Sequence, residues 1–199
     1  EPYESQSGNY YDYKMQHMNA NMNFGVPFTE NDTVYFGAGF EQYKVKQQNR
    51  ELPKEYQDFQ KEYGGNSAYG IPLTVGWSRD RRDSALAPSS GSYHRLFGAV
   101  SPAGDMKYAL ATYRYQYFYP LSKKYTFALN TDLAYGKSLG GKSFPIFKNF
   151  YSGGLSSVRC FEQSSLGPKN VDLDGDTYSV GGSKKFNVNM EVVAPFPGA

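Results

Sequence analysis

The sequence predicts an all-β chain of antiparallel, up-and-down strands, and three observations support this fold class. Polar and apolar residues alternate with a period of two along several segments, as expected of strands with one polar and one apolar face. The 199 residues include 19 Tyr, 14 Phe, 21 Gly and 11 Pro, a composition rich in strand and turn formers. No run of 18 apolar residues is present, which excludes helical membrane spans.

The alternation defines seven strands, most of them near the length that crosses a bilayer at a tilt. In the first strand, even positions hold Met, Ala, Met, Phe and Val, whereas odd positions hold His, three Asn and Gly. In the last strand, Asn187, Asn189 and Glu191 alternate with apolar residues. The pattern of the fourth strand, 93–100, does not show which of its side chains lie on the polar face and which on the apolar face. The predicted strands are 17–26, 34–40, 73–77, 93–100, 109–119, 125–136 and 186–192.

The connections between these strands alternate in length. Because up-and-down strands place successive connections at opposite ends, both long connections fall on the same side. Outer-membrane barrels show this arrangement, with short turns at one end and long extracellular loops at the other. The modest connections are 28–33, 79–92 and 120–124, and the others are 46–70, 102–105 and 137–184.

The polar faces of the strands favour a membrane barrel over the alternative, a soluble β-sandwich with the same alternation. They hold mainly Asn, Gly and Thr rather than the Lys and Glu of a solvated surface, as expected of a wet lumen. A mean hydropathy of −0.65 is compatible with a barrel, because alternating strands average to a polar value. Tyrosines also gather near strand ends, as in an interfacial girdle; they are Tyr117, Tyr119, Tyr125 and Tyr135.

The connection 46–70 is expected to contain a short helix that covers the barrel mouth. Pro53 suits its first turn, and Gly64 suits its C-terminal cap. Three aromatic side chains would share one face of this helix: Tyr56, Phe59 and Tyr63.

The segment 171–180 predicts a hairpin that turns at an Asp-Gly pair. Its carboxylates imitate the spacing of a calcium loop, but a threonine stands where the turn glycine is needed. A serine also replaces the bidentate glutamate, so we expect no metal. The carboxylates are those of Asp172, Asp174 and Asp176.

Charge and cysteine content exclude further classes of chemistry. A formal net charge of +2 gives no basic footprint for nucleic acid. The single cysteine excludes an intramolecular disulfide and a cysteine-based zinc site. No histidine lies near Cys160 in the sequence, which disfavours a nucleophilic role for the thiol.

The longest connection contains an ordered set of motifs: an aromatic-Gly-Gly segment, then Val-Arg-Cys-Phe, then Gly-Pro-Lys. Together with the strand that follows, this set resembles the signature loop of the BamA family of outer-membrane protein assembly factors. The resemblance covers essentially the whole chain, and its specific part is 144–199. The motif residues are Phe150, Tyr151, Gly153, Gly154, Val158, Arg159, Cys160, Phe161, Gly167, Pro168 and Lys169.

The resemblance implies that residues 1–199 are the middle part of a transmembrane β-barrel. The POTRA domains and the remaining strands of the family are absent from this sequence. It also implies that 46–70 is an extracellular loop and that 137–184 folds into the lumen. Cys160 stands where the family has glycine. Since glycine permits unusual φ values, we expect the cysteine to perturb the loop tip.

The resemblance implies a function in the outer membrane of Gram-negative bacteria. The family assists the folding and insertion of β-barrel proteins without ATP or a redox cofactor, so neither an enzyme nor a cofactor is expected. The implied partners are unfolded barrel substrates, assembly-complex lipoproteins and membrane lipid, with no nucleic acid. This segment lacks the family's lateral gate, so alone we expect it to have no insertase activity.

Three other functions stay open at this point. A two-partner secretion transporter of the same superfamily shares a related loop but exports a passenger protein. An outer-membrane barrel hydrolase would need a catalytic cluster, yet the sequence has no G-x-S-x-G or H-E-x-x-H motif and only two histidines. A soluble ligand-binding β-barrel is the third.

The alternation places Glu191 on the polar face, since a carboxylate facing lipid would be costly. In the family, the loop arginine contacts acidic groups of the inner wall, one of them on the strand that matches 186–192. We therefore hypothesise a charge-assisted Arg159–Glu191 pair, which the guanidinium and carboxylate groups can make bidentate, in a confined and partly desolvated lumen. The alternative is a solvated arginine and an unpaired glutamate. Gly167, Pro168 and Lys169 are expected to form a rigid turn that returns the chain from the loop tip.

Overall fold

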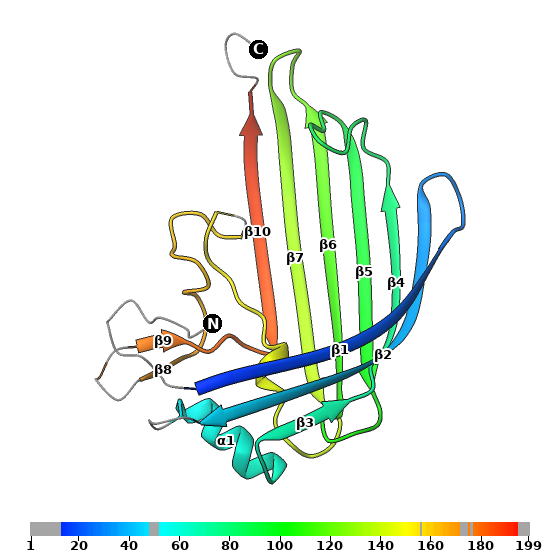
Figure 1. Cartoon of the computed structure of the whole chain (residues 1–199). Helices are drawn as coiled ribbons and strands as arrows, with labels where there is room; N and C mark the ends of the chain where they lie inside the picture. The colour runs from blue at the N-terminus through cyan, green and yellow to red at the C-terminus, as the bar shows by residue number, and fades with distance from the viewer. Residues whose placement is uncertain (1–12, 48–51, 156, 172–174, 176, 195–199) are drawn as a thin grey trace.

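A computed structural model describes residues 13–47, 52–155, 157–171, 175 and 177–194. Most of the chain forms one curled antiparallel sheet in which seven strands neighbour one another in chain order, while β3 pairs with β2 (Figure 1). A separate two-stranded sheet pairs β8 with β9. The main strands are β1 (Tyr13–Pro27), β2 (Asp32–Gln47), β4 (Leu73–Asp80), β5 (Gly91–Ser101), β6 (Tyr108–Pro120), β7 (Thr126–Ser138) and β10 (Lys184–Val193). The shorter elements are α1 (Lys54–Tyr63), β3 (Ser67–Gly70), the 3-10 turn η1 (Ile146–Lys148), β8 (Lys169–Val171) and β9 (Thr177–Ser179).

All seven predicted strands are present, so the predicted antiparallel all-β architecture is confirmed. The connections alternate as expected. The short ones, 28–31, 81–90 and 121–125, lie at one end of the sheet, which we call the short-turn end. The opposite end, called the long-loop end, carries α1, β3 and the long connection 139–183 (Figure 1).

The two faces of the sheet differ as the alternation predicted. In β10, Phe186 and Met190 are 71% and 69% exposed, whereas Asn187 between them is 8% exposed. Met22 of β1, on the same face as Phe186, is 66% exposed. We call the face that carries these apolar side chains the outer face. The opposite, polar face is the inner face, and the long connection packs against it.

β2 extends further than predicted because its pattern changes phase after Phe40. Before that point the apolar side chains lie on the outer face. From Glu41 onward the inward positions hold Tyr43 and Val45, which are buried, while Lys44 alternates with them. The prediction ended at Phe40 because a strand whose apolar residues change sides no longer matches a single alternation.

A hydrophobic core closes the long-loop end on the inner face. Phe59 of α1 packs with Tyr43, and the ring of Phe147 stacks on Tyr43 with centroids 4.3 Å apart. The helix has the predicted form: it starts after Pro53 and ends at Gly64, whose φ is +71°. The other members of the core cluster are Ala68, Met106 and Tyr108, with Tyr63, Leu110, Phe144 and Ile146 packed against it.

The predicted hairpin is present as β8 and β9, whose register pairs Lys169 with Ser179. The three carboxylates at calcium-like spacing, Asp172, Asp174 and Asp176, lie outside the described residues. Elsewhere in the described chain, no group of three or more potential metal ligands is gathered. No described helix is long and apolar enough to cross a membrane.

Candidate functional site

The long connection is held on the inner face by side chains of β10. Asn187 is bound on both sides of its amide: Ser152 Oγ donates to its Oδ1, and its Nδ2 donates to Ser157 Oγ, both at 2.9 Å. Two residues further along, Asn189 Nδ2 donates to the carbonyl oxygen of Ser157 at 2.7 Å. Because strand residues two apart point to the same side, alternate residues of β10 form a row of contacts along the loop.

Arg159 and Glu191 continue this row. Arg159 Nη2 lies 3.2 Å from Glu191 Oε2, so the structure brings the two residues of the hypothesised pair together. The geometry differs from the expectation in two respects: there is one nitrogen–oxygen contact, and the Arg159 side chain is 63% exposed. Loop atoms cover Asn187 but leave the guanidinium open to solvent, so the pair is not desolvated. Such an exposed pair contributes about 1 kcal/mol or less.

Two glycines of the motif allow the loop to close on itself. Gly153 and Gly154 have φ values of +113° and +94°, which favour glycine. Neither position has room for a side chain. A Cβ at Gly153 would lie 2.4 Å from the carbonyl oxygen of Glu162, and a Cβ at Gly154 would lie 2.1 Å from the Gln163 side chain. The Gly154 N–H donates to the Phe161 carbonyl at 3.1 Å. The aromatic-Gly-Gly segment is therefore the base on which the loop tip folds back.

The remaining motif residues occupy the tip and the return of the loop. Cys160 is exposed and has a φ of +69°, which explains physically why glycine suits this position. Val158 is half-buried and Phe161 is exposed. The return turn consists of Gly167, with a φ of +118°, Pro168, whose carbonyl accepts the Val180 N–H at 3.0 Å, and Lys169, which begins β8.

A buried ion pair at the start of the long connection was not predicted from the sequence. Lys148 Nζ lies 2.5 Å from Glu41 Oε2, and Tyr108 OH donates to Glu41 Oε1 at 2.7 Å. Glu41 and Tyr108 are buried, and the Lys148 side chain is 20% exposed. The available signal was the position of Glu41 at the change of phase in β2, which places an acid among inward apolar residues.

The first residues of the long connection also fit the wall closely. The ring of Phe144 lies over Gly136 of β7, where an added Cβ would be 2.3 Å from Phe144 Cζ. Glu55 of α1 accepts hydrogen bonds from Asn170 Nδ2 at 3.1 Å and from Tyr178 OH at 2.6 Å. The helix, the hairpin and the wall are thus joined around the loop.

Comparison with known proteins gives these contacts a family context. Residues 2–199 match the Omp85 superfamily domain. The chain belongs to the Omp85 superfamily. It is 39% identical to the outer membrane protein assembly factor BamA of Neisseria meningitidis serogroup B, with 94% of this chain and 24% of that protein covered. Nitratidesulfovibrio vulgaris BamA is 23% identical, with 93% of this chain and 23% of that protein covered.

The fold of this Omp85 chain is similar to a solved BamA barrel. The crystal structure of BamA from Haemophilus ducreyi lacking POTRA domains 1–3 matches it with a TM-score of 0.82 and 26% identity. The match covers 94% of this chain and 38% of that one. The chain thus spans about a quarter of the length of the two curated relatives. As predicted, it forms part of an integral outer-membrane protein, and the two curated relatives are named assembly factors.

Proposed function

We propose that the complete protein assists the folding and insertion of β-barrel proteins into the bacterial outer membrane. One observation carries the proposal: the signature loop lies on the inner face and is held there by alternate residues of β10. This segment supplies a part of the wall and the loop that occupies it. The apolar outer face supports contact with lipid, because exposed apolar area of this extent is unfavourable in water.

The partners follow from the same proposal. The complete protein acts on unfolded outer-membrane β-barrel substrates and works with lipoproteins of an assembly complex. The connections 46–70 and 137–184 lie on the extracellular side, with 137–184 folded into the lumen. The BamA proteins to which the chain is similar are named assembly factors, which favours this function over a two-partner secretion transporter or a barrel hydrolase.

Substrate insertion by the complete protein in liposomes tests the proposal. The variant carries Asn187→Ala and Asn189→Ala, which remove three hydrogen bonds to the loop. We expect a several-fold slower appearance of a protease-protected barrel substrate, because the loop loses its fixed position. Met190→Ala on the outer face of the same strand is the matched control and should insert substrate at the wild-type rate.

Two outcomes would contradict the proposal at different points. If the wild-type protein, folded in liposomes, inserts no barrel substrate, the proposed activity is wrong. If the asparagine variant and the Met190→Ala control insert substrate equally fast, the loop contacts have no part in that activity.

A further inference from the structure

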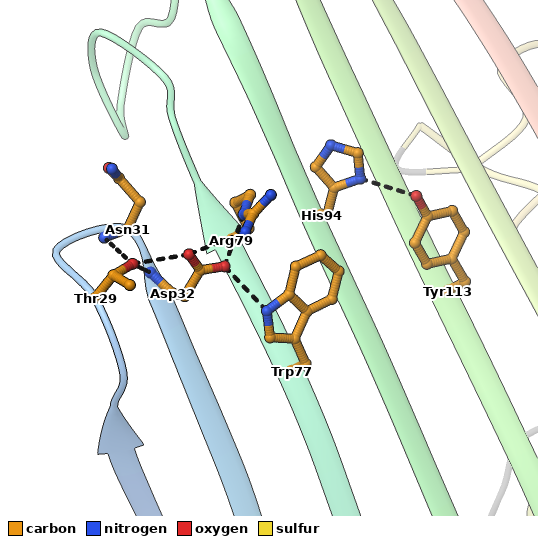
Figure 2. Close-up of polar contacts among 7 residues, drawn as sticks. All are labelled: Thr29, Asn31, Asp32, Trp77, Arg79, His94 and Tyr113. Atoms are coloured by element: carbon orange, nitrogen blue, oxygen red, sulfur yellow. Dashed lines mark hydrogen bonds and ion pairs between the residues drawn. The ribbon is translucent and has the colours of Figure 1, made fainter.

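A cluster of polar and charged side chains lies on the outer face, at the short-turn end (Figure 2). The register pairs Asp32 of β2 with Arg79 of β4, and Arg79 with His94 of β5, so these three residues share one face. Two positions along, the same face carries Val34, Trp77 and Leu96. The cluster is therefore where the apolar surface of the wall ends.

The Asp32 carboxylate is fully engaged within the wall. Arg79 donates to it from Nε at 2.7 Å and from Nη2 at 3.2 Å, while Trp77 Nε1 donates at 3.0 Å and Thr29 Oγ1 at 2.8 Å. Its side chain is 8% exposed, so it offers a ligand little surface. These bonds also fix the direction of the Arg79 guanidinium, which lies over the Trp77 ring with its central carbon 5.4 Å from the ring centroid.

The groups that stay accessible are cationic or hydrogen-bond donors. The Arg79 side chain is 38% exposed, and within the described part of the chain it donates from Nε and Nη2 to Asp32, which leaves its other N–H donors for a ligand. Arg81 continues the ladder beyond β4, since its N–H donates to the Ser92 carbonyl at 2.9 Å, and it is exposed. His94 Nδ1 is bonded to Tyr113 OH at 2.9 Å, which leaves Nε2 unused by that bond.

The surroundings indicate which anion fits this cluster. Two arginines against one carboxylate leave a net charge of +1, and guanidinium groups bind phosphate through paired N–H donors. Directly beyond Trp77 the outer face is apolar, with Val75 and Phe36 exposed. A ligand that spans both regions needs a phosphate joined to hydrocarbon chains. Tryptophan is also enriched at the level where lipid headgroups meet the hydrocarbon.

We propose that Arg79, Arg81 and His94 form an outer-face site for the phosphate of a phospholipid, with Asp32 and Trp77 as positioning residues for Arg79. The proposal rests on the outer face contacting lipid, which is part of the proposed function, but it does not require insertase activity. The acyl chains of the bound lipid lie along Val75 and Phe36.

Native mass spectrometry of the complete protein in detergent tests this site by titration with phosphatidylglycerol. The variant carries Arg79→Gln and Arg81→Gln. The matched control carries Lys123→Gln and Lys124→Gln, two exposed cations in the turn between β6 and β7 at the same end of the wall. We expect the arginine variant to bind the first lipid about tenfold more weakly, and the control to bind it as the wild type does.

Arg81→Gln alone keeps the Asp32–Arg79 pair, and so it serves if the double variant does not fold. The Arg81→Gln variant should weaken lipid binding about threefold.

Competition experiments identify the part of the lipid that is bound. Diacylglycerol, which lacks the phosphate, should not compete for the site, and inorganic phosphate at equal concentration should not displace the lipid. If both arginine variants bind lipid like the lysine control, the site does not exist. If inorganic phosphate displaces the lipid, the cluster is an ion site only. Each result is independent of the insertion assay, so a failure here leaves the proposed activity untouched.

Discussion

At the scale of single residues, the loop tip contains a conflict between side chain and backbone. Cys160, exposed at the tip of the loop, has a φ of +69°, a region that disfavours any residue with a Cβ. The family resemblance led us to expect that a cysteine in place of glycine would perturb the loop tip. The two bonds that flank it, from Gly154 to Phe161 and from Arg159 to Glu191, hold the backbone in that conformation.

Cys160→Gly should stabilise the loop by about 1 kcal/mol, the usual scale of left-handed strain in a residue with a side chain. We expect hydrogen exchange of the Gly154 amide, which bonds to Phe161, to slow by about fivefold. Cys160→Ala keeps the Cβ and is the control, with exchange close to wild type. Equal exchange in all three proteins would mean that the positive φ costs nothing.

Arg159 and Glu191 should show a small coupling in a double-mutant cycle of the complete protein. Arg159→Ala, Glu191→Ala and the double variant, compared by urea unfolding, are expected to give a coupling of about 0.5 kcal/mol, since the pair is exposed. Strict additivity would exclude the pair. A coupling of several kcal/mol would instead show that the pair is desolvated in the complete barrel.

At the scale of elements, the seven strands could be predicted because alternation is a local property of each segment. The contacts that seat the loop could not, with the exception of Arg159–Glu191, which came from the family resemblance. Ser152 and Ser157 carry no pattern that points to Asn187, and β3 is a short strand inside a loop with no alternation of its own. Such features depend on segments far apart in sequence.

Gly136→Ala should displace Phe144 from the wall and destabilise the complete protein by roughly 1–3 kcal/mol, as overpacking does. Thermal unfolding measured by circular dichroism would report this loss. Gly98→Ala in β5 is the control, because a Cβ there meets its nearest atom at 3.6 Å, an ordinary contact. Similar melting of the two variants would show that Phe144 does not occupy this position.

The connection between β4 and β5 should respond to acid. Hydrogen bonds from Ser89 and Ser90 lower the pKa of the Asp83 carboxyl from 3.8 to about 2. A depressed pKa stabilises the loop when the group is ionised, so this stabilisation is complete above pH 4 and is lost as the pH falls through about 2. The protection factor of the Ser89 amide, which compares its exchange rate with the intrinsic rate at the same pH, should therefore fall below that pH, and Asp83→Asn should remove this dependence. A protection factor that does not change with pH in the wild type would contradict this.

At the scale of the whole molecule, one buried ion pair joins parts of the chain that are far apart. Glu41 in β2, Tyr108 in β6 and Lys148 in the long connection meet at the long-loop end. The Lys148–Glu41 pair fixes the start of the connection to the inner face at the long-loop end. The contacts with β10 fix the middle of the connection further along the inner face, toward the short-turn end.

Lys148→Ala should destabilise the complete protein by about 3–5 kcal/mol, because it leaves the Glu41 carboxylate buried without its cation. Limited proteolysis should then cut the long connection much faster. Lys137→Ala, at an exposed position of β7, is the control and should be cut at the wild-type rate. Adding Glu41→Gln to Lys148→Ala should recover a large part of the lost stability. If it recovers none, the charge of Glu41 is not the cause.

The row formed by Asn187, Asn189 and Glu191 also makes docking of the loop depend on the register between β10 and β7. A strand paired with β7 one position out of register would turn all three side chains toward lipid and present Phe186, Val188 and Met190 to the loop instead. The loop would then find no partners and stay undocked. Docking of the loop therefore favours the observed pairing of β10 with β7 over a pairing shifted by one position.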